Sequence, residues 1–505
     1  MQMETNEIMI SRKREPLKLE IPAEGTVLVP DIKPDVAEIL EVVGRAVLDK
    51  ADCENGRLSV SGRILYTVLY RPEDTESVLC AISGSLPFSG METVQGIQEG
   101  MPVHFSCSAP FNEASVLNSR KLSVRGVVEI TAVPYENEKV SVLASDAEGI
   151  CAQKQKTEGF TLVAETQNRI HLTERFSLPN GELPIREILL YESTVRDFSV
   201  KVVDNKAVIK GEIHMCFLYQ PEDSFSPASF EETIEIAEIQ DIPGLTPDLD
   251  CCFDLKVEEF SAEAVPGENG QMFDVLAEIS LLFSCVATEP MAAEWITDGF
   301  IPGRETKAVQ KEITMQKLLP GMQIPVSVKD RITLAGDMQP ISRVLRFWAT
   351  PSPEWAEGQL RCDLLLGLLY QDTSGNVCFL KQPLRRDVYC EIPTNAVCDG
   401  KARLLSLEYV ISGETALEFR AELAIEIQGT TEETVLAVTD MEFSEEELLQ
   451  RPSVVICFIG EGDTLWSIAK RYKITEEEIL AANAMHEGAE LTSGQRLLIP
   501  RYHAE

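Results

Sequence analysis

The feature that most constrains the fold is a segment that occurs three times along the chain. The run RLSVSGRILYTVLYRPED ends its apolar stretch at Tyr70, KAVIKGEIHMCFLYQPED ends at Tyr219, and the weaker copy QLRCDLLLGLLYQDTSG ends at Tyr370. In each copy alternate residues are mostly apolar or small, which is typical of a strand with one buried face. We therefore expect three copies of one β module.

A second shared element lies upstream of each of these strands. The segments PDVAEIL, PIREILL and PISRVLRF place Leu40, Leu189 and Leu345 at equivalent positions, and the third copy has a shortened connection to its strand. Further alternating strands follow in each copy. Because an alternating strand needs a partner layer to bury its apolar face, each module is predicted to be a small β-sandwich or barrel-like meander of mostly antiparallel strands.

The predicted organisation is mainly β, with three tandem repeats followed by a small terminal domain. The connector before that domain is acidic, and Ser444 with Glu447 forms a capping box that would open a short helix ended by Pro452. The ranges 136–160 and 290–312 are mixed and polar, so they are expected to be linkers or bridging strands. The expected units are residues 1–135, 161–289 and 313–430 for the three β domains, the third one divergent, 431–452 for the acidic connector and 453–501 for the terminal domain.

The terminal domain shows a β, α, α, β order. Residues 454–459 form an apolar strand, and Asp463 or Thr464 is placed to cap a helix with apolar residues at helical spacing. Thr475 with Glu478 is a capping box for a second helix, and residues 497–499 form the last strand.

The strings GDTLWSIAKRY, EEIL and GQRLLIP within residues 454–500 resemble the LysM family. This resemblance implies a βααβ fold and, in many members, a shallow groove for N-acetylglucosamine glycans such as peptidoglycan. Trp466 stands beside the core-facing Leu465, so it is either an exposed aromatic anchor for a partner or a core residue. Two departures from the family pattern are Cys457, in place of a large residue, and Lys473, in place of the usual glycine. The candidate partner- or glycan-binding residues are Gly462, Asp463, Thr464, Leu465, Trp466, Met485 and Leu491.

The three β repeats resemble the SPOCS family of sporulating bacteria. The resemblance rests on the openings PDVAEIL and PIREILL, on the strand-turn segments that end in YRPED and YQPED, and on the QNRI tract that begins at Gln167. Tandem SPOCS modules before one terminal LysM are the layout of a spore-coat morphogenesis protein. The resemblance implies a non-enzymatic scaffold, cytoplasmic in the mother cell at the forespore surface. Its LysM would dock onto a spore-coat morphogenetic ATPase, a stage IV sporulation protein.

Two other functions remain open. The GDTLW and GQRLLIP strings are also compatible with a protein that binds peptidoglycan or N-acetylglucosamine in the cell wall or spore cortex. Self-association of the β repeats into a surface lattice is the third hypothesis.

The charge of the chain argues against some classes of partner. There are 82 acidic and 45 basic side chains, a formal net charge of -37. Nucleic acid and anionic lipid would be repelled without a local basic patch. No apolar run approaches the about 18 to 20 residues of a membrane span, so we expect no membrane insertion, and no export signal is recognised. The thirteen cysteines include no CxxC, which predicts reduced thiols in a cytosolic setting.

No catalytic set is recognised in the sequence. The five histidines form no HExxH pattern, and no GxSxG, Walker A or GxGxxG string has the required strand-loop-helix context. We therefore expect no enzyme, no cofactor and no metal site.

Overall fold

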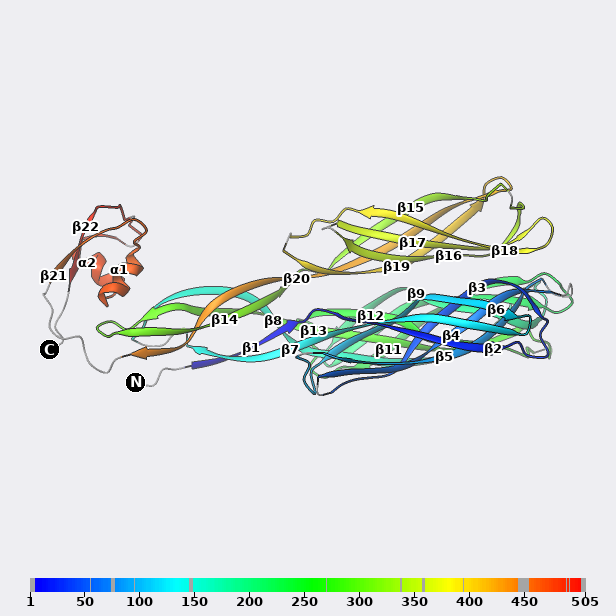
Figure 1. The fold of residues 1–505 in the computed structure, drawn as a ribbon, viewed down its shortest axis with the longest axis horizontal. Helices are drawn as coiled ribbons and strands as arrows, with labels where there is room; N and C mark the ends of the chain where they lie inside the picture. Colours follow the sequence, from blue (N-terminus) through cyan, green and yellow to red (C-terminus); the bar gives the residue numbers. More distant parts are fainter. Residues whose placement is uncertain are drawn as a thin grey trace.

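The computed structural model describes residues 5–54, 56–73, 78–94, 96–144, 149–268, 270–336, 338–356, 359–393, 395–443, 454–486, 488–489 and 491–500. Over these residues the chain forms 22 strands and two short helices, so the predicted mainly β class is confirmed. Twenty strands precede the terminal domain (Figure 1): β1 (Thr5–Lys13), β2 (Leu17–Leu28), β3 (Val36–Glu54), β4 (Arg57–Pro72), β5 (Cys80–Thr93), β6 (Val103–Asn118), β7 (Lys121–Leu143), β8 (Cys151–Ser177), β9 (Ile185–Val203), β10 (Lys206–Pro221), β11 (Ala228–Asp241), β12 (Asp250–Val265), β13 (Asp274–Phe300), β14 (Thr306–Leu318), β15 (Met322–Thr333), β16 (Ile341–Ala356), β17 (Gln359–Asp372), β18 (Val377–Val388), β19 (Val397–Ile411) and β20 (Ala416–Phe443).

Each repeat folds into two antiparallel sheets that pack face to face. In the first repeat the sheet β3-β4-β5 covers a sheet in which β7 lies between β2 and β6. The second repeat has β9-β10-β11 over β8-β13-β12, and the third has β16-β17-β18 over β15-β20-β19. Each sandwich core contains residues from both of its sheets, because the period-two pattern turns one face of every strand inward.

The tyrosines that mark the repeat occupy the same place in all three sandwiches. Tyr70, Tyr219 and Tyr370 lie near the ends of the central strands β4, β10 and β17, and each is fully buried. The hydroxyl of Tyr70 donates to the carbonyl oxygen of Pro34 at 3.1 Å, and that of Tyr219 donates to Oε2 of Glu182 at 2.9 Å. The third copy therefore keeps the architecture of the first two although its sequence is more divergent.

Three long two-stranded antiparallel ribbons extend beyond the sandwiches and pack together. They are β1 with the end of β7, the start of β8 with the end of β13, and β14 with the end of β20. We call these three ribbons the stalk. Most of the described residues of the ranges 136–160 and 290–312 lie in these strands. The buried core of the stalk consists of Ile10, Val140, Val142, Ala293, Trp295, Ile313, Met315, Val435 and Ala437.

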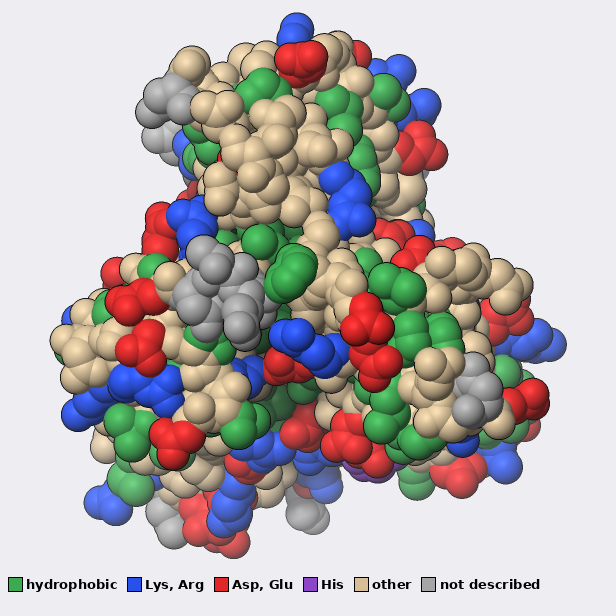
Figure 2. Space-filling view, turned by 90° about the vertical axis from the view of Figure 1, so that its right-hand side faces the viewer, with side chains coloured by type: hydrophobic (Ala, Val, Ile, Leu, Met, Phe, Trp, Pro, Cys, Tyr) green, Lys and Arg blue, Asp and Glu red, His purple; other side chains and the backbone are tan. Residues whose placement is uncertain are grey.

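The three sandwiches meet around a common centre, and Figure 2 shows them as three lobes. The equivalent residues Leu189 and Leu345 are buried in one apolar cluster there, and Leu40 packs against it partly buried. The residues just before the repeat tyrosines, Leu69, Leu218 and Leu369, belong to the same cluster, which we call the hub. The leucines that mark the repeat in the sequence are therefore the residues that hold the copies together.

Ion pairs add a charged contact to each junction between sandwiches. Lys33 pairs with Glu187 between the first and second, and Lys401 pairs with Asp254 at 2.7 Å between the second and third. Lys381 pairs with Glu41 at 2.7 Å between the third and first. Burial raises the pKa of Glu41, and the bond from Lys381 opposes this shift. Such pairs specify which faces meet more than they stabilise the contact.

The terminal domain has the predicted β, α, α, β order. It consists of β21 (Val454–Phe458), α1 (Leu465–Tyr472), α2 (Glu476–Ala482) and β22 (Arg496–Pro500), with the two strands antiparallel. Its core is buried and apolar, and Cys457 belongs to it. Before this domain β20 continues to Phe443, so the first part of the acidic connector is a strand, whereas the helix expected between Ser444 and Pro452 lies outside the described residues.

Candidate partner-binding site on the terminal domain

The loop before α1 is held in shape by Asp463. Its Oδ2 accepts a hydrogen bond from the backbone N–H of Gly460 at 2.9 Å, and its Oδ1 pairs with Arg471 at 2.5 Å. These two contacts, the backbone bond first, lower the pKa of Asp463. Gly462 has φ +81°, a left-handed conformation that glycine adopts without strain, and it is exposed. Asp463 therefore shapes the loop, while Gly462 faces solvent.

Thr464 is the residue that caps the first helix. Its Oγ1 accepts from the backbone N–H of Ser467 at 3.1 Å, and Oγ of Ser467 accepts from the N–H of Thr464 at 2.9 Å, a complete capping box. Of the two predicted caps, Asp463 or Thr464, the structure uses Thr464. The second predicted box is also present, between Thr475 and Glu478.

The two sides of the predicted groove pack on one core. Leu465 from the first side and Met485 and Leu491 from the second are partly buried against the same apolar cluster of the terminal domain. Gly462 and Thr464 are exposed beside them. Leu465, Met485 and Leu491 thus share one core, and two residues of the second loop, 487 and 490, lie outside the described part.

Trp466 packs against the second repeat, at the end of β13. Its indole Nε1 donates to Oδ2 of Asp298 at 2.9 Å, and its ring centroid lies 5.3 Å from that of the fully buried Phe300. Lys470, one turn further along α1, donates to Oδ1 of Asp298 at 2.5 Å. Burial alone would raise the pKa of Asp298, but the bonds from Lys470 and Trp466 outweigh burial and lower it. Trp466 therefore anchors the terminal domain to the end of β13 in the same chain.

A second contact lies at the end of α1. The backbone N–H of Gly303 donates to the carbonyl oxygen of Lys473 at 2.8 Å, and the Lys473 ammonium lies 3.5 Å from Glu305. Lys473 has φ 58°, the left-handed conformation for which glycine is the usual choice at a helix end. The departure from the family pattern at Lys473 thus coincides with a bond to the stalk.

Reasoning from the sequence missed Asp298 and Phe300. Both lie in the range 290–312, where the mixed composition suggests a linker or a bridging strand. The available signal was an apolar strand pattern that includes Trp295, followed three residues later by the charged Asp298. This pattern does not by itself indicate a contact with a domain more than 150 residues away.

The described residues hold no cluster of three or more His, Cys, Asp or Glu side chains that could bind a metal ion. His104 lies 3.2 Å from Glu165, and His214 lies 3.3 Å from the hydroxyl of Thr233 on the neighbouring strand. In the same part of the chain, no helix has the length and apolar character required to cross a bilayer.

Comparison with known families agrees with the geometry. A family model described as "SipL, SPOCS domain" matches residues 35–117 and 184–265, in the first and second sandwiches. A model of the LysM domain matches residues 459–500. No curated protein matches the chain. The chain therefore carries tandem SPOCS repeats and a C-terminal LysM domain, as the resemblance implied, and both matched models describe non-catalytic domains.

Proposed function

We propose that this chain, with its SPOCS repeats and C-terminal LysM domain, is a non-enzymatic scaffold of the spore coat whose LysM docks onto a coat morphogenetic ATPase, a stage IV sporulation protein. The two kinds of domain together suggest a spore-coat protein. In this proposal the protein acts in the cytoplasm of the mother cell, at the forespore surface.

The observation that carries this proposal is the way the LysM is held. Asp298 and Phe300 at the end of the stalk bind one face of α1, while Gly462 and Thr464 remain exposed. Figure 1 shows the LysM beyond the stalk, at the far end from the sandwiches. A small domain fixed at the tip of a long β body suits presentation of its free loops to a partner.

The charge of the chain supports a protein partner over an anionic wall polymer. With a formal net charge of -37, long-range repulsion opposes approach to an anionic polymer and favours a basic or neutral surface.

The test is recovery of the ATPase by the immobilised full-length chain from a lysate of sporulating cells. Leu465→Ala, in the predicted groove, is expected to lower recovery several-fold because it removes apolar contact area at the exposed loops. Phe458→Ala is the control, since this side chain is exposed on β21 outside the loop set. Equal recovery by Leu465→Ala and the unaltered chain contradicts the proposal.

The second candidate is binding of peptidoglycan or N-acetylglucosamine glycan, which the LysM match favours. Sedimentation of the full-length chain with purified peptidoglycan decides between the two functions. Saturable pelleting that Leu465→Ala abolishes supports the glycan, whereas no pelleting removes this candidate.

A further inference from the structure

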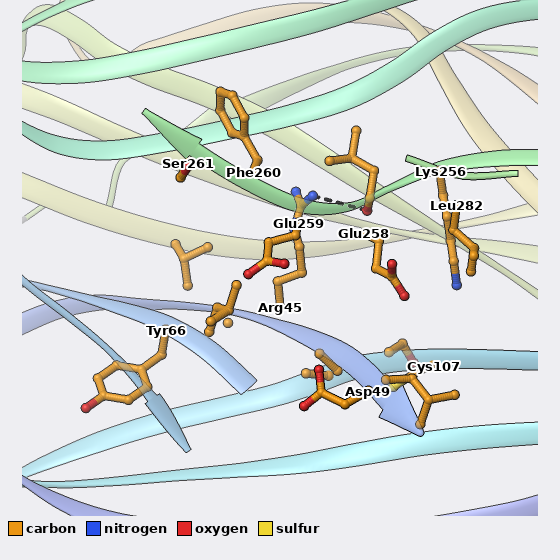
Figure 3. A pocket seen from close by; sticks show the side chains of 18 of the residues that line it. Arg45, Asp49, Tyr66, Cys107, Lys256, Glu258, Glu259, Phe260, Ser261 and Leu282 are labelled. Carbon is orange, nitrogen blue, oxygen red and sulfur yellow. Dashed lines mark hydrogen bonds between the residues drawn. The ribbon is translucent and has the colours of Figure 1, made fainter. Parts of the chain in front are cut away.

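A cleft of roughly 660 Å³ lies between the first and second sandwiches. It is bounded by β3, β4 and β6 of the first repeat and by β8, β9 and β12 of the second, and Figure 3 shows it from close by. Its lining combines charged residues with apolar side chains such as Leu48, Phe105 and Leu282. Its volume is within the usual range for a small-molecule site.

Arg45 crosses from the first sandwich to the second in this cleft. Its Nη2 donates to the carbonyl oxygen of Ser193 at 3.0 Å and its Nη1 to that of Val257 at 3.2 Å, next to a bulge in β12 between Val257 and Glu259. A guanidinium has five N–H donors, so these bonds use only part of its capacity. Within the described residues no carboxylate forms an ion pair with Arg45, and burial lowers its pKa to about 10.

Lys256 is the second basic residue of the cleft. It comes from β12, and its side chain extends into the cleft on the side of Cys107 (Figure 3). Over the described part of the chain its ammonium makes no hydrogen bond and no ion pair, although a lysine ammonium has three donors. Burial lowers the pKa of Lys256, and the charges of Asp254 and Glu258 oppose this shift without cancelling it.

The acidic residues near these two cations are already engaged. Both oxygens of Glu258 accept from Arg169, at 2.5 and 2.9 Å. Glu259 and Asp49 both pair with Arg63. Asp254, the carboxylate that acts most strongly on Lys256, pairs with Lys401 at 2.7 Å. In the described part of the chain, neither Arg45 nor Lys256 therefore has a carboxylate in direct contact. Because a buried charge without a counter-charge is costly, an anion in the cleft would offset that cost.

We propose that this cleft binds a small organic phosphate, with its phosphate held by Arg45 and Lys256 and its apolar part against Leu48, Phe105 and Leu282. Phosphate oxygens match the donors of a guanidinium and an ammonium in number and charge. The cleft is larger than a bare phosphate ion would fill. We therefore infer that the ligand carries an organic part. The ligand would bridge the first two sandwiches, so its binding would also stabilise their junction.

Calorimetric titration of the full-length chain tests this with three probes: phenyl phosphate, inorganic phosphate and phenol. Phenyl phosphate is expected to bind saturably and more tightly than inorganic phosphate, because it adds apolar contact, and phenol is expected not to bind. Failure of phenyl phosphate to bind saturably overturns the proposal.

Variants distinguish ligand binding in the cleft from binding elsewhere on the surface. Lys256→Met keeps the length of the side chain and removes its charge, so it should weaken phenyl phosphate about tenfold or more. Arg45→Gln should do the same, but it also alters the bonds to the second sandwich. Lys256→Met decides alone if Arg45→Gln fails to fold. The matched control is Lys329→Met, since Lys329 is exposed on β15 of the third sandwich. Equal affinity in Lys256→Met and Lys329→Met would mean adventitious surface binding and overturn the proposal.

Discussion

The indole of Trp466 and the carboxylate of Asp298 join the LysM domain to the second repeat, through a hydrogen bond of 2.9 Å across 168 residues of chain. Lys470 binds the other oxygen of the same carboxylate. One side chain of the stalk therefore receives two donors from α1, and with Phe300 and Gly303 it holds the LysM in its orientation.

Asp298→Asn is expected to loosen this contact without unfolding either part. The substitution keeps the size of the side chain but removes the charge that Lys470 binds, and bonds to charged groups contribute about 1.5–3 kcal/mol. Hydrogen exchange should rise in α1 and around residues 298–305. Asp363→Asn is the control, because Asp363 pairs with Arg385 on the third sandwich. Unchanged exchange in α1 would show that Phe300 and Gly303 suffice to hold the domain.

Leu345→Ala is expected to lower the free energy of unfolding by about 2–5 kcal/mol, because Leu345 is buried in the hub and truncation leaves a cavity. Leu365→Ala, on the neighbouring strand β17 but 40% exposed, should change it by about 0.5 kcal/mol or less. Urea unfolding monitored by circular dichroism measures both. A loss of stability in Leu345→Ala no larger than in Leu365→Ala would contradict a structural role for the hub.

Trp295→Ala is expected to cost about 3–5 kcal/mol of stability. Trp295 is fully buried in the stalk, and its Nε1 donates to Oγ1 of Thr157 at 2.6 Å, so truncation removes apolar packing and a buried hydrogen bond. Thermal unfolding should shift strongly in Trp295→Ala and little in Met9→Ala, since Met9 lies on β1 with 41% of its surface exposed. Similar shifts in the two variants would mean that the stalk core adds nothing to stability.

His214→Gln is expected to reduce the loss of stability on acidification. Burial, and then the charge of Arg196, lowers the pKa of His214 from 6.5 to about 4. Between these values the unfolded chain binds a proton at this imidazole and the folded chain does not, so falling pH favours unfolding. The free energy of unfolding, measured in urea at pH 7 and at pH 4.5, should fall less in His214→Gln than in the unaltered chain. Equal losses would exclude His214 as the source.

Much of the fold could be predicted from local patterns. Alternation in the strands that end at Tyr70 and Tyr219 indicates a buried face. A cap at Asp463 or Thr464 and the capping box at Thr475 predict where the two LysM helices begin. These signals are short-range, because each depends on residues within one strand or one helical turn.

The arrangement of the repeats could not be predicted in this way. Alternation shows that a strand has an apolar face, but it does not show which surface covers that face. Leu189 and Leu345 occupy equivalent positions in the repeats, but only their positions in space show that they meet in the hub.

In the candidate site, too, local patterns predict some features and not others. The sequence places Gly462, Thr464 and Leu465 at the loop before α1, whereas the docking of Trp466 on Asp298 depends on tertiary structure that leaves no local pattern. Whether Trp466 is an exposed anchor or a packed residue therefore depends on the position of β13, which the local sequence does not indicate.

The stalk also limits how many repeats this architecture can hold. Its first ribbon contains β1, at the start of the repeats, and its third contains the end of β20, where the repeats finish, and residues of both lie in one core. An open solenoid can gain or lose units at its ends because each unit contacts only its neighbours. Here the first and last copies are already neighbours, so a fourth copy would have no free end to join and would have to reopen both the stalk and the hub. Closure therefore disfavours the addition of a fourth copy.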